Sequence, residues 1–554
     1  MTSKNGLGLL IFIHVLTLSS GMAQPSKRTN ELAVTTRSDT LTKAYDYFCT
    51  WRTQRMQLRP EFVKPGAVQR DFRVAMRDNL NETVLFGEQG WVTTLYPSVR
   101  KNLLFVLDYG WDVPLSTSKP LDISRFGGLI PDPDRFPSLV GTPAEKLRQL
   151  RERVTQAGWK GLGLWVAVQQ AGEGDSLSAI VAEAESYWRE RARWSRQAGI
   201  VYWKVDWGKH AKEENYRAMM TRVAREEAPN LQLEHAYTGD FFNDLESANS
   251  RAGGDAGGGR FKYAENGAVL TNTLNLLAVS DVLRTYDVAY MLAVSTTLDR
   301  VVELLKNNPG AKRTFLNTED ELYLSVVLHT ALGVMRSPLP PGRMRLPYHN
   351  LVEVYQRNTE VLRAVNWRTL APVVPAGQSS LLQSDTVLVD TWNFGVRPDQ
   401  YNNLTVRQGA PAVISLNMPL PRVKTFNTPP PFVLASQHPN GAVAVATLPR
   451  TSVERGIHTP LADVDINLMD ATKPVGVFGY YNSLTLTFPS ALKKVRVMAQ
   501  DLANPATKPE DITDRLVIQK NRIILPGTLI QQIGLSANGP EDLSEPGLIL
   551  TFTR

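Results

Sequence analysis

Between about residue 100 and residue 370, the sequence alternates short apolar runs with longer segments whose apolar residues recur at helical spacing. The short runs have the length and composition of buried strands, and the longer segments end at Gly or Pro. This alternation predicts a parallel sheet covered by helices. The runs are NLLFVLDYGW (102–111), KGLGLWVAV (160–168), GIVYWKVDWG (199–208), LQLEHAY (231–237) and AVSDVLRTYDV (278–288).

About 270 residues of such alternation suit a closed eight-stranded barrel. We therefore predict an α/β fold, with a (β/α)8 TIM barrel over residues 96–370. The alternative is an open, doubly wound sheet, which is less favoured because no Gly-rich phosphate fingerprint follows the first run.

The 554 residues are too many for one compact core, so further domains are expected on either side of the barrel. Residues 371–554 consist of alternating or β-branched runs separated by turn signals, and they predict a C-terminal antiparallel β-domain, a β-sandwich. Residues 24–95 are polar and helix-like, and we expect an N-terminal helical segment there.

Residues 1–23 have the pattern of a secretory signal peptide: Lys4, then an apolar stretch, then small residues ending at Ala23. An uncleaved anchor is the alternative, but the stretch is shorter than the roughly 20 residues of a spanning helix. We therefore expect a secreted or periplasmic protein with no membrane span after cleavage. The sole cysteine, Cys49, cannot form an internal disulfide and is expected to pack as a small apolar residue.

The charge pattern narrows the class of partner. A formal net charge of +7 favours acidic glycans or anionic surfaces, but the charges are scattered and no basic run alternates with aromatic residues. Nucleic-acid binding is therefore not expected. Seven histidines without short spacing predict no metal site, and no cofactor is expected. The oligomeric state stays open.

Several of the predicted strands carry carboxylates near their C-terminal ends, where the active sites of parallel barrels lie. Asp108 precedes Trp111, a pairing suited to sugar hydroxyls and an apolar sugar face. Lys204 and Asp206 share one strand face, and the ammonium group would keep the carboxylate ionised as a nucleophile. The other candidates are Glu234, Asp281, Arg284 and Asp287.

These residues fit glycoside hydrolysis, in which one carboxylate attacks the sugar and another protonates the leaving oxygen. The order of motifs resembles glycoside hydrolase clan D, the α-galactosidase and α-N-acetylgalactosaminidase family. The segments that carry the resemblance are GGLIPDPDRFPS (127–138), AGWKGLGLWV (157–166), VLDYGW, YWKVDWG, LEHAY, VLRTYDV and LNTEDELYLSVVLHTALGVMRSPL (316–339).

The resemblance implies a retaining exo-α-glycosidase acting on oligo- or polysaccharides, with Asp206 as nucleophile and Asp287 as acid/base. It further implies that Asp108, Lys204, Glu234 and Arg284 contact the substrate. Tyr109 stands where the family has a second Asp, and the Arg-to-Asp spacing is one residue shorter, so Asp281 remains a rival of Asp287. The alternatives are another sugar specificity, for example on an acidic polysaccharide, or a barrel that binds carbohydrate without catalysis.

Overall fold

The computed structural model describes most of the chain from residue 44 onward. The signal peptide expected at residues 1–23 lies outside the described residues. The described ranges are 44–58, 69–115, 125–172, 181–236, 267–285, 294–307, 313–339, 357–394, 404–426, 429–470, 472–492 and 494–553.

Eight parallel strands form the centre of the larger domain, in the order β7-β6-β5-β4-β3-β2-β1-β8. β1 pairs with both β2 and β8, and a parallel bridge from Asn317 to Ala331 links β7 to the residues just before β8. The sheet therefore closes on itself, which confirms the predicted (β/α)8 barrel. The strands are β1 (Tyr47–Cys49), β2 (Leu104–Leu107), β3 (Gly161–Val166), β4 (Tyr202–Val205), β5 (Gln232–Ala236), β6 (Val282–Arg284), β7 (Phe315–Asn317) and β8 (Gly333–Val334).

The first barrel strand lies inside residues 24–95, where the sequence predicted helices alone. β1 has only three residues, and Tyr47 and Cys49 point into the barrel while Phe48 packs outward. A strand this short offers no apolar run, and the helix α1 (Trp51–Met56) follows almost at once. The barrel therefore begins about 50 residues earlier than the predicted boundary at residue 96.

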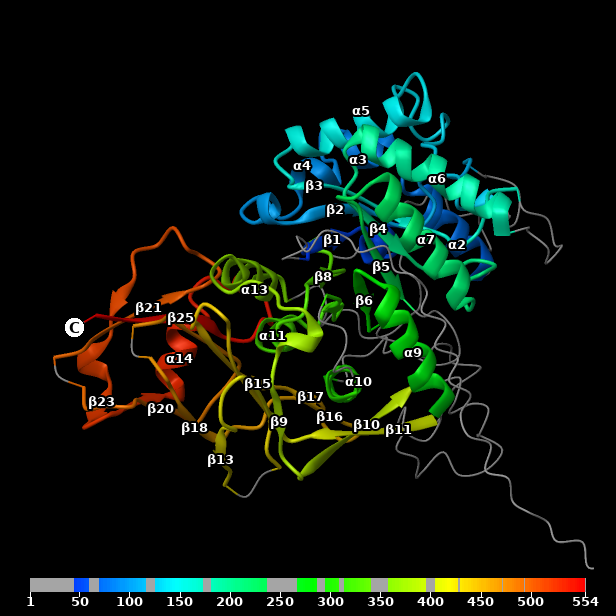
Figure 1. Ribbon diagram of the computed structural model, residues 1–554. Helices are drawn as coiled ribbons and strands as arrows, with labels where there is room; N and C mark the ends of the chain where they lie inside the picture. Colours follow the sequence, from blue (N-terminus) through cyan, green and yellow to red (C-terminus); the bar gives the residue numbers. More distant parts are fainter. Residues whose placement is uncertain are drawn as a thin grey trace, which may run out of the picture.

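Helices surround the strands, as Figure 1 shows. The clearest local signal belongs to α5, where Thr142 and Glu145 form a capping box and Pro143 opens the helix. The other helices of this domain are α2 (Gln69–Asp78), α3 (Glu82–Phe86), α4 (Trp91–Thr94), α6 (Val181–Ala198), α7 (Glu214–Glu227), α9 (Gly267–Val279), α10 (Val294–Lys306), α11 (Leu322–Val327) and α13 (Asn358–Leu370); α5 is Pro143–Gln156.

Strand alternation divides the barrel into two apolar layers. Inward-facing residues such as Val106, Tyr202 and Phe315 fill the interior. Their neighbours, for example Trp203, face outward and join the larger core beneath the helices. Because side chains alternate along a strand, a polar residue two positions beyond an interior residue points toward the barrel axis.

The C-terminal domain is β-rich, as predicted, but not purely antiparallel. Its main sheets have the orders β22-β21-β25-β19-β15-β14-β12-β9 and β13-β18-β20-β24-β23. The pairs β12–β14, β15–β19 and β18–β20 are parallel, so the prediction of an antiparallel domain was wrong in this respect. Alternating runs reveal strands but not their pairing direction.

The elements of this domain are β9 (Leu381–Gln383), β10 (Val387–Phe394), β11 (Leu404–Pro411), β12 (Val413–Leu416), β13 (Arg422–Lys424), β14 (Phe432–Gln437), β15 (Val443–Leu448), β16 (Arg450–Ser452), β17 (Gly456–His458), β18 (Asp463–Asn467), β19 (Val475–Phe478), β20 (Ser483–Thr487), β21 (Arg496–Asp501), β22 (Glu510–Asp511), β23 (Val517–Gln519), β24 (Arg522–Pro526), α14 (Gly527–Gly534) and β25 (Gly547–Thr553). Their inward faces form a second core.

The two domains share a buried contact through α13. Arg363 makes a two-pronged ion pair with Asp501 of β21, with both N–O distances 2.9 Å. Trp367 packs against Phe478 of β19. Within the described ranges, no helix is long and apolar enough to cross a membrane.

Candidate functional site

The predicted site residues converge at the C-terminal ends of the barrel strands. Asp108 directly follows β2, Asp206 directly follows β4, and Arg284 ends β6. Lys204 and Glu234 lie within β4 and β5 and are Cα partners across the two strands. Tyr47 of β1 and Glu319, two residues beyond β7, also join this cluster and were not among the predicted site residues.

Asp206 is held from two sides. Arg284 Nη2 donates to Oδ1 at 2.9 Å, and Trp165 Nε1 donates to Oδ2 at 2.9 Å. The Asp206 backbone is fixed as well, because its N–H donates to Val166 and its carbonyl accepts from Arg217. The side chain remains 15% exposed, more than the other carboxylates of the cluster. Asp206 is thus an oriented carboxylate that a ligand can reach.

Glu319 binds both cations of the cluster through one oxygen. Its Oε1 lies 3.1 Å from Arg284 Nη1 and 3.4 Å from Lys204 Nζ, and it accepts from the Tyr47 hydroxyl at 3.1 Å. Burial would raise the pKa of Glu319, but Arg284 and Lys204 outweigh it and hold the pKa at about 2. The side chain is therefore an ionised acceptor at any neutral or mildly acidic pH.

Lys204 points at Asp108 rather than at Asp206. Its ammonium lies 2.9 Å from Asp108 Oδ2, which also accepts from the Cys49 thiol at 2.9 Å. Asp108 Oδ1 accepts from the Tyr109 N–H, so both of its oxygens are engaged within the protein. Burial, and then Asp108, raises the pKa of Cys49 well above its usual range, which keeps the thiol protonated. Cys49 is buried in the apolar cluster of the barrel interior, as expected, and its thiol also contacts Asp108 and Lys204.

Glu234 lies deeper in the barrel and is fully buried. Its carboxylate accepts from the hydroxyls of Tyr47 at 3.0 Å and Tyr202 at 2.8 Å, and from the Asn317 amide. Burial raises the pKa of Glu234 despite the nearby Arg284. In this arrangement, Glu234 supports the floor of the site from below.

The tryptophans divide between packing and the site. Trp111 is fully buried in the outer core, and its indole donates to the Trp165 carbonyl at 3.0 Å. Trp203 is also buried there and donates to Ser195. Trp207 is partly exposed beside Asp206, with its ring 5.4 Å from that of Trp165. Tyr109 and Phe126 continue this aromatic wall.

Asp281 and Asp287 were the two candidates for the acid/base, and the structure describes only Asp281. Asp281 directly precedes β6, at the opposite end of the barrel from Asp206, where it pairs with Arg225 at 2.9 Å and accepts from the Leu233 N–H. The structure therefore separates Asp281 from the site. Asp287 lies outside the described residues.

Tyr47 and Glu319 were missed because each has only a weak signal in the sequence. Tyr47 belongs to a three-residue strand without an apolar run. Glu319 stands in the polar stretch TED that follows β7, and a search for carboxylates after every short strand would have found it.

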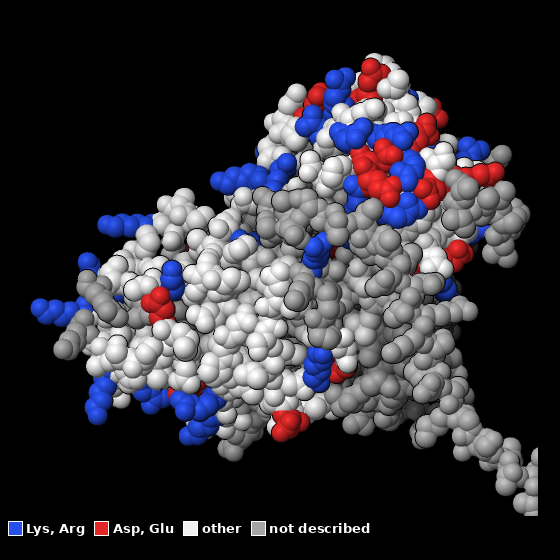
Figure 2. Space-filling model, in the orientation of Figure 1, with Lys and Arg blue, Asp and Glu red and all other residues white. Residues whose placement is uncertain are grey.

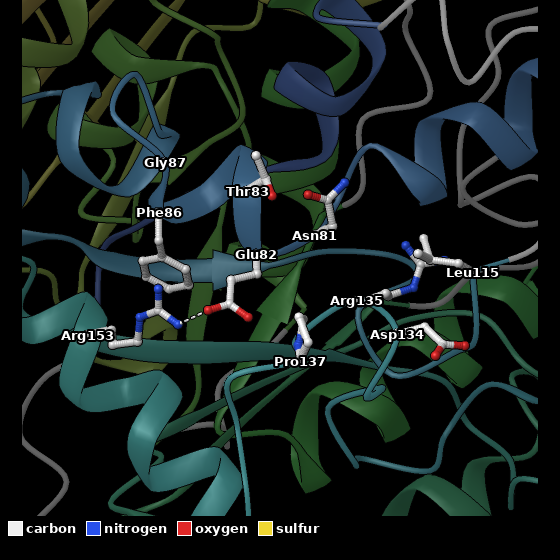
Figure 3. Close-up of a pocket in the computed structure, with 10 residues that line it drawn as sticks. All are labelled: Asn81, Glu82, Thr83, Phe86, Gly87, Leu115, Asp134, Arg135, Pro137 and Arg153. Atoms are coloured by element: carbon white, nitrogen blue, oxygen red, sulfur yellow. Dashed lines mark hydrogen bonds and ion pairs between the residues drawn. The ribbon is translucent and has the colours of Figure 1, made fainter.

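Away from this cluster, a pocket of about 580 Å³ lies on the flank of the barrel, between α3, α5 and the segment around Pro137 (Figure 3). Glu82 there pairs with Arg153, whose guanidinium lies 4.1 Å from the centre of the Phe86 ring, and also with Ser138. Arg135 is bonded to Asp78 and several carbonyls. These charges are thus already satisfied by the protein.

The outer surface over α6 and α7 carries interleaved charges of both signs, visible as the red and blue cluster in Figure 2. Arg189 contacts Glu185, Glu226 and Glu227, and Arg222 contacts Glu185. Each cation there faces carboxylates, so this face is not uniformly basic. Among the described residues, no group of three or more His, Cys, Asp or Glu side chains is arranged to hold a metal ion.

Fold and site together define a (β/α)8-barrel protein with carboxylates and cations gathered at one end of the barrel. No family model and no curated protein matches the sequence. Among solved structures, a GH27 β-L-arabinopyranosidase from Geobacillus stearothermophilus is similar with 11% identity and a TM-score of 0.37, over 93% of this chain and 96% of that one.

A putative α-galactosidase from Bacteroides fragilis is similar with 9% identity and a TM-score of 0.36, over 93% of this chain and 79% of that one. An α-amylase from Anoxybacillus has 10% identity and a TM-score of 0.37, over 92% and 98% of the two chains. At such identities and TM-scores, these similarities assign neither a family nor an activity to this chain.

Proposed function

We propose that this protein is a secreted retaining exo-α-glycosidase, most similar in activity to an α-galactosidase, with Asp206 as its nucleophile. The observation that carries the proposal is the setting of Asp206. A partly exposed carboxylate at a barrel-strand end is held by one guanidinium and one indole N–H, which leaves lone pairs on both oxygens for reaction.

In the first step, an Asp206 oxygen attacks the anomeric carbon and forms a glycosyl ester, while the bond to the leaving oxygen breaks. A protonated carboxyl group gives its proton to that oxygen. In the second step, the same group, now a carboxylate, takes a proton from water as the water attacks the anomeric carbon and releases Asp206.

We propose Asp287 as this acid/base, three residues after the end of β6. Among the described carboxylates of the site, Glu319 is a poor acid because its cationic neighbours keep it ionised. Glu234 is buried beneath the site with partners on both oxygens, and Asp108 is engaged by Lys204, Cys49 and Tyr109. The position of Asp281 at the other barrel end supports the same assignment.

The nucleophile is tested by Asp206→Asn. We expect the variant to keep its fold and its sugar binding but to lose nearly all turnover of aryl α-glycosides, because an amide cannot form the glycosyl ester. Substantial remaining turnover would reject the assignment. Wild-type protein that binds sugars but cleaves none of a panel of α-linked oligosaccharides would instead indicate a non-catalytic carbohydrate-binding barrel.

The acid/base is tested by Asp287→Ala beside Asp281→Ala. We expect Asp287→Ala to slow cleavage of poor leaving groups far more than that of activated aryl glycosides, which need little protonation, and added azide to restore part of the second step. The matched variant Asp281→Ala should show neither effect. The opposite pattern would transfer the role to Asp281.

A further inference from the structure

Glu319 uses one of its two carboxylate oxygens for its contacts with the described residues. All three of its contacts, from Tyr47, Arg284 and Lys204, reach Oε1. In the part of the chain that the structure describes, no hydrogen bond or ion pair reaches Oε2. The Glu319 side chain is 9% exposed. Glu319 therefore offers an acceptor oxygen that none of the described residues occupies.

Glu319 and Asp206 are tied together by a single side chain. Arg284 gives Nη1 to Glu319 and Nη2 to Asp206, at 3.1 and 2.9 Å. Its planar guanidinium fixes both carboxylates relative to each other. A ligand that reaches Asp206 therefore comes close to Glu319.

Among the described side chains that contact one another here, carboxylates outnumber cations. Lys204 and Arg284 are the cations that contact these carboxylates, and the guanidinium of Arg217 donates to the backbone carbonyl of Asp206. Facing them are Asp108, Asp206 and Glu319, with Glu234 beneath. A sugar carboxylate bound beside Asp206 and Glu319 would meet like charges in a poorly solvated setting, which is costly.

We propose that Glu319 contacts the substrate directly through Oε2 and, together with Asp206, restricts the site to an uncharged sugar ring that presents hydroxyl donors. This proposal rests on the glycosidase function proposed above and narrows it, because it excludes uronic acids at the position that Asp206 attacks. A sugar hydroxyl donates to an ionised carboxylate in a strong, charge-assisted hydrogen bond.

The first test measures binding and does not depend on turnover. Galactose and galacturonate, and glucose and glucuronate, are titrated into the wild-type protein at pH 7 and followed by ligand-observed NMR. We expect a neutral sugar to bind at least 10-fold more tightly than its uronate. Equal or tighter binding of the uronates would overturn the proposal, and so would the absence of binding by any neutral sugar.

The second test uses Glu319→Gln, which keeps the size of the side chain but removes its charge. We expect the affinity for the neutral sugar to fall about 10- to 100-fold, the usual effect of losing a hydrogen bond to a charged group. The preference over the uronate should also shrink. Glu303→Gln on α10, far from the site in the fold, is the matched control and should behave as wild type.

Deoxy sugars distinguish direct contact between Glu319 and the substrate from a purely structural role of Glu319. Removing the hydroxyl that Glu319 contacts should weaken binding to wild type but cause no further loss in Glu319→Gln, whereas the other deoxy sugars should weaken both proteins equally. If Glu319→Gln does not fold, Tyr47→Phe replaces it. This variant removes the Tyr47 contacts to Glu319 Oε1 and to Glu234 beneath the site but leaves Oε2 of Glu319 unchanged, so it should preserve the preference for neutral sugars. Loss of that preference in Tyr47→Phe would contradict the role of Oε2.

The two proposals fail in different ways. Neutral sugars that bind selectively but are never cleaved as glycosides would reject the glycosidase and retain the role of Glu319. Efficient cleavage of uronides by the wild-type protein would retain the glycosidase and reject the role of Glu319.

Discussion

At the residue scale, the orientation of Asp206 depends on side chains that come from different strands. Trp165 belongs to β3 and Arg284 to β6, and each donates to a different oxygen of the carboxylate. An aspartate free to rotate would present a productive oxygen only part of the time, whereas two donors fix its plane. The indole N–H of Trp165 should therefore matter to the reaction as well as to packing.

Replacing Trp165 by Phe removes that N–H donor and keeps an aromatic ring in the wall. We expect kcat/KM for aryl α-glycosides to fall about 10- to 100-fold, the usual effect of losing a hydrogen bond to a charged group. Trp203→Phe is the matched control, because its indole donates to Ser195 on the outer side of the barrel. An equal loss of kcat/KM in both variants would mean that the effect is one of packing.

The sequence predicted the position of a carboxylate correctly where it follows an apolar run. It did not predict which side chains contact each other across different strands. Asp206 and Arg284 were placed near each other by motif order, and the structure joins them in an ion pair. Lys204 was expected to pair with Asp206 because the two share a strand face, whereas its ammonium lies against Asp108. Which carboxylate a lysine meets depends on how the other strands of the barrel are placed, here β2 beyond β3, and this is not encoded in spacing along one strand.

At the element scale, β8 approaches the site through a residue without a side chain. A Cβ built on Gly333 would lie 2.7 Å from Asn317 Oδ1, 2.9 Å from Glu319 Cγ and 2.9 Å from the Tyr47 hydroxyl. Those distances are below van der Waals contact, so β8 can close the barrel beside the polar cluster only with a glycine here.

Gly333→Ala should push Glu319 and Asn317 away from their positions. We expect a loss of stability of about 1–3 kcal/mol, typical of overpacking, together with at least a 10-fold fall in kcat/KM. Gly163→Ala on β3 is the matched control, because its Cβ would meet Val106 Cγ2 at 2.9 Å and Tyr202 Cβ at 3.3 Å, both hydrocarbon atoms. We expect urea unfolding to show similar losses in the two variants, and kinetics to show a large loss in Gly333→Ala alone. Normal kinetics in Gly333→Ala would contradict this account.

The first strand, β1, was not predicted because hydrophobic patterns identify only strands with a long enough apolar run. β3, with six fully buried residues, was visible as an apolar run, whereas β1 pairs through three residues whose neighbours include Asp46 and Thr50. Asp46 is buried and accepts from the Leu332 N–H, so it helps to close the barrel between β1 and β8. A polar residue with such a role looks like a surface residue in the sequence.

At the scale of the whole molecule, the barrel and the β-domain are joined by buried polar groups as well as by apolar packing. His329, just after α11, and His438, between β14 and β15, lie with ring centres 4.0 Å apart. His329 also contacts Ser379, and Trp367 of α13 lies beside His438. Both imidazoles are buried, so the junction accommodates them in their neutral forms.

This junction should weaken in acid. Burial, and then Arg368, lowers the pKa of His438 from 6.5 to about 3, and burial, His438 and Arg368 lower the pKa of His329 well below its usual range. Because the folded-state pKa lies below the unfolded one, the unfolded chain takes up protons first as the pH falls. The stabilisation is complete above about pH 6.5 and is lost progressively toward pH 3. Between pH 7 and pH 4.5, His438 alone should cost about 2–3 kcal/mol.

The measurement is the free energy of unfolding in urea at pH 7 and at pH 4.5, for wild type and for His438→Gln. The variant should be less stable at pH 7, but its loss between the two pH values should be smaller than that of wild type by about 2–3 kcal/mol, because Gln does not titrate. His458→Gln, in the β16–β17 hairpin, is the matched control and should keep the wild-type loss. The carboxylates titrate in all three proteins, so their contribution to the free energy of unfolding cancels when the losses are compared. If His438→Gln loses as much stability in acid as wild type, the buried pair does not set the acid limit, and the carboxylate clusters of the barrel become the groups to examine.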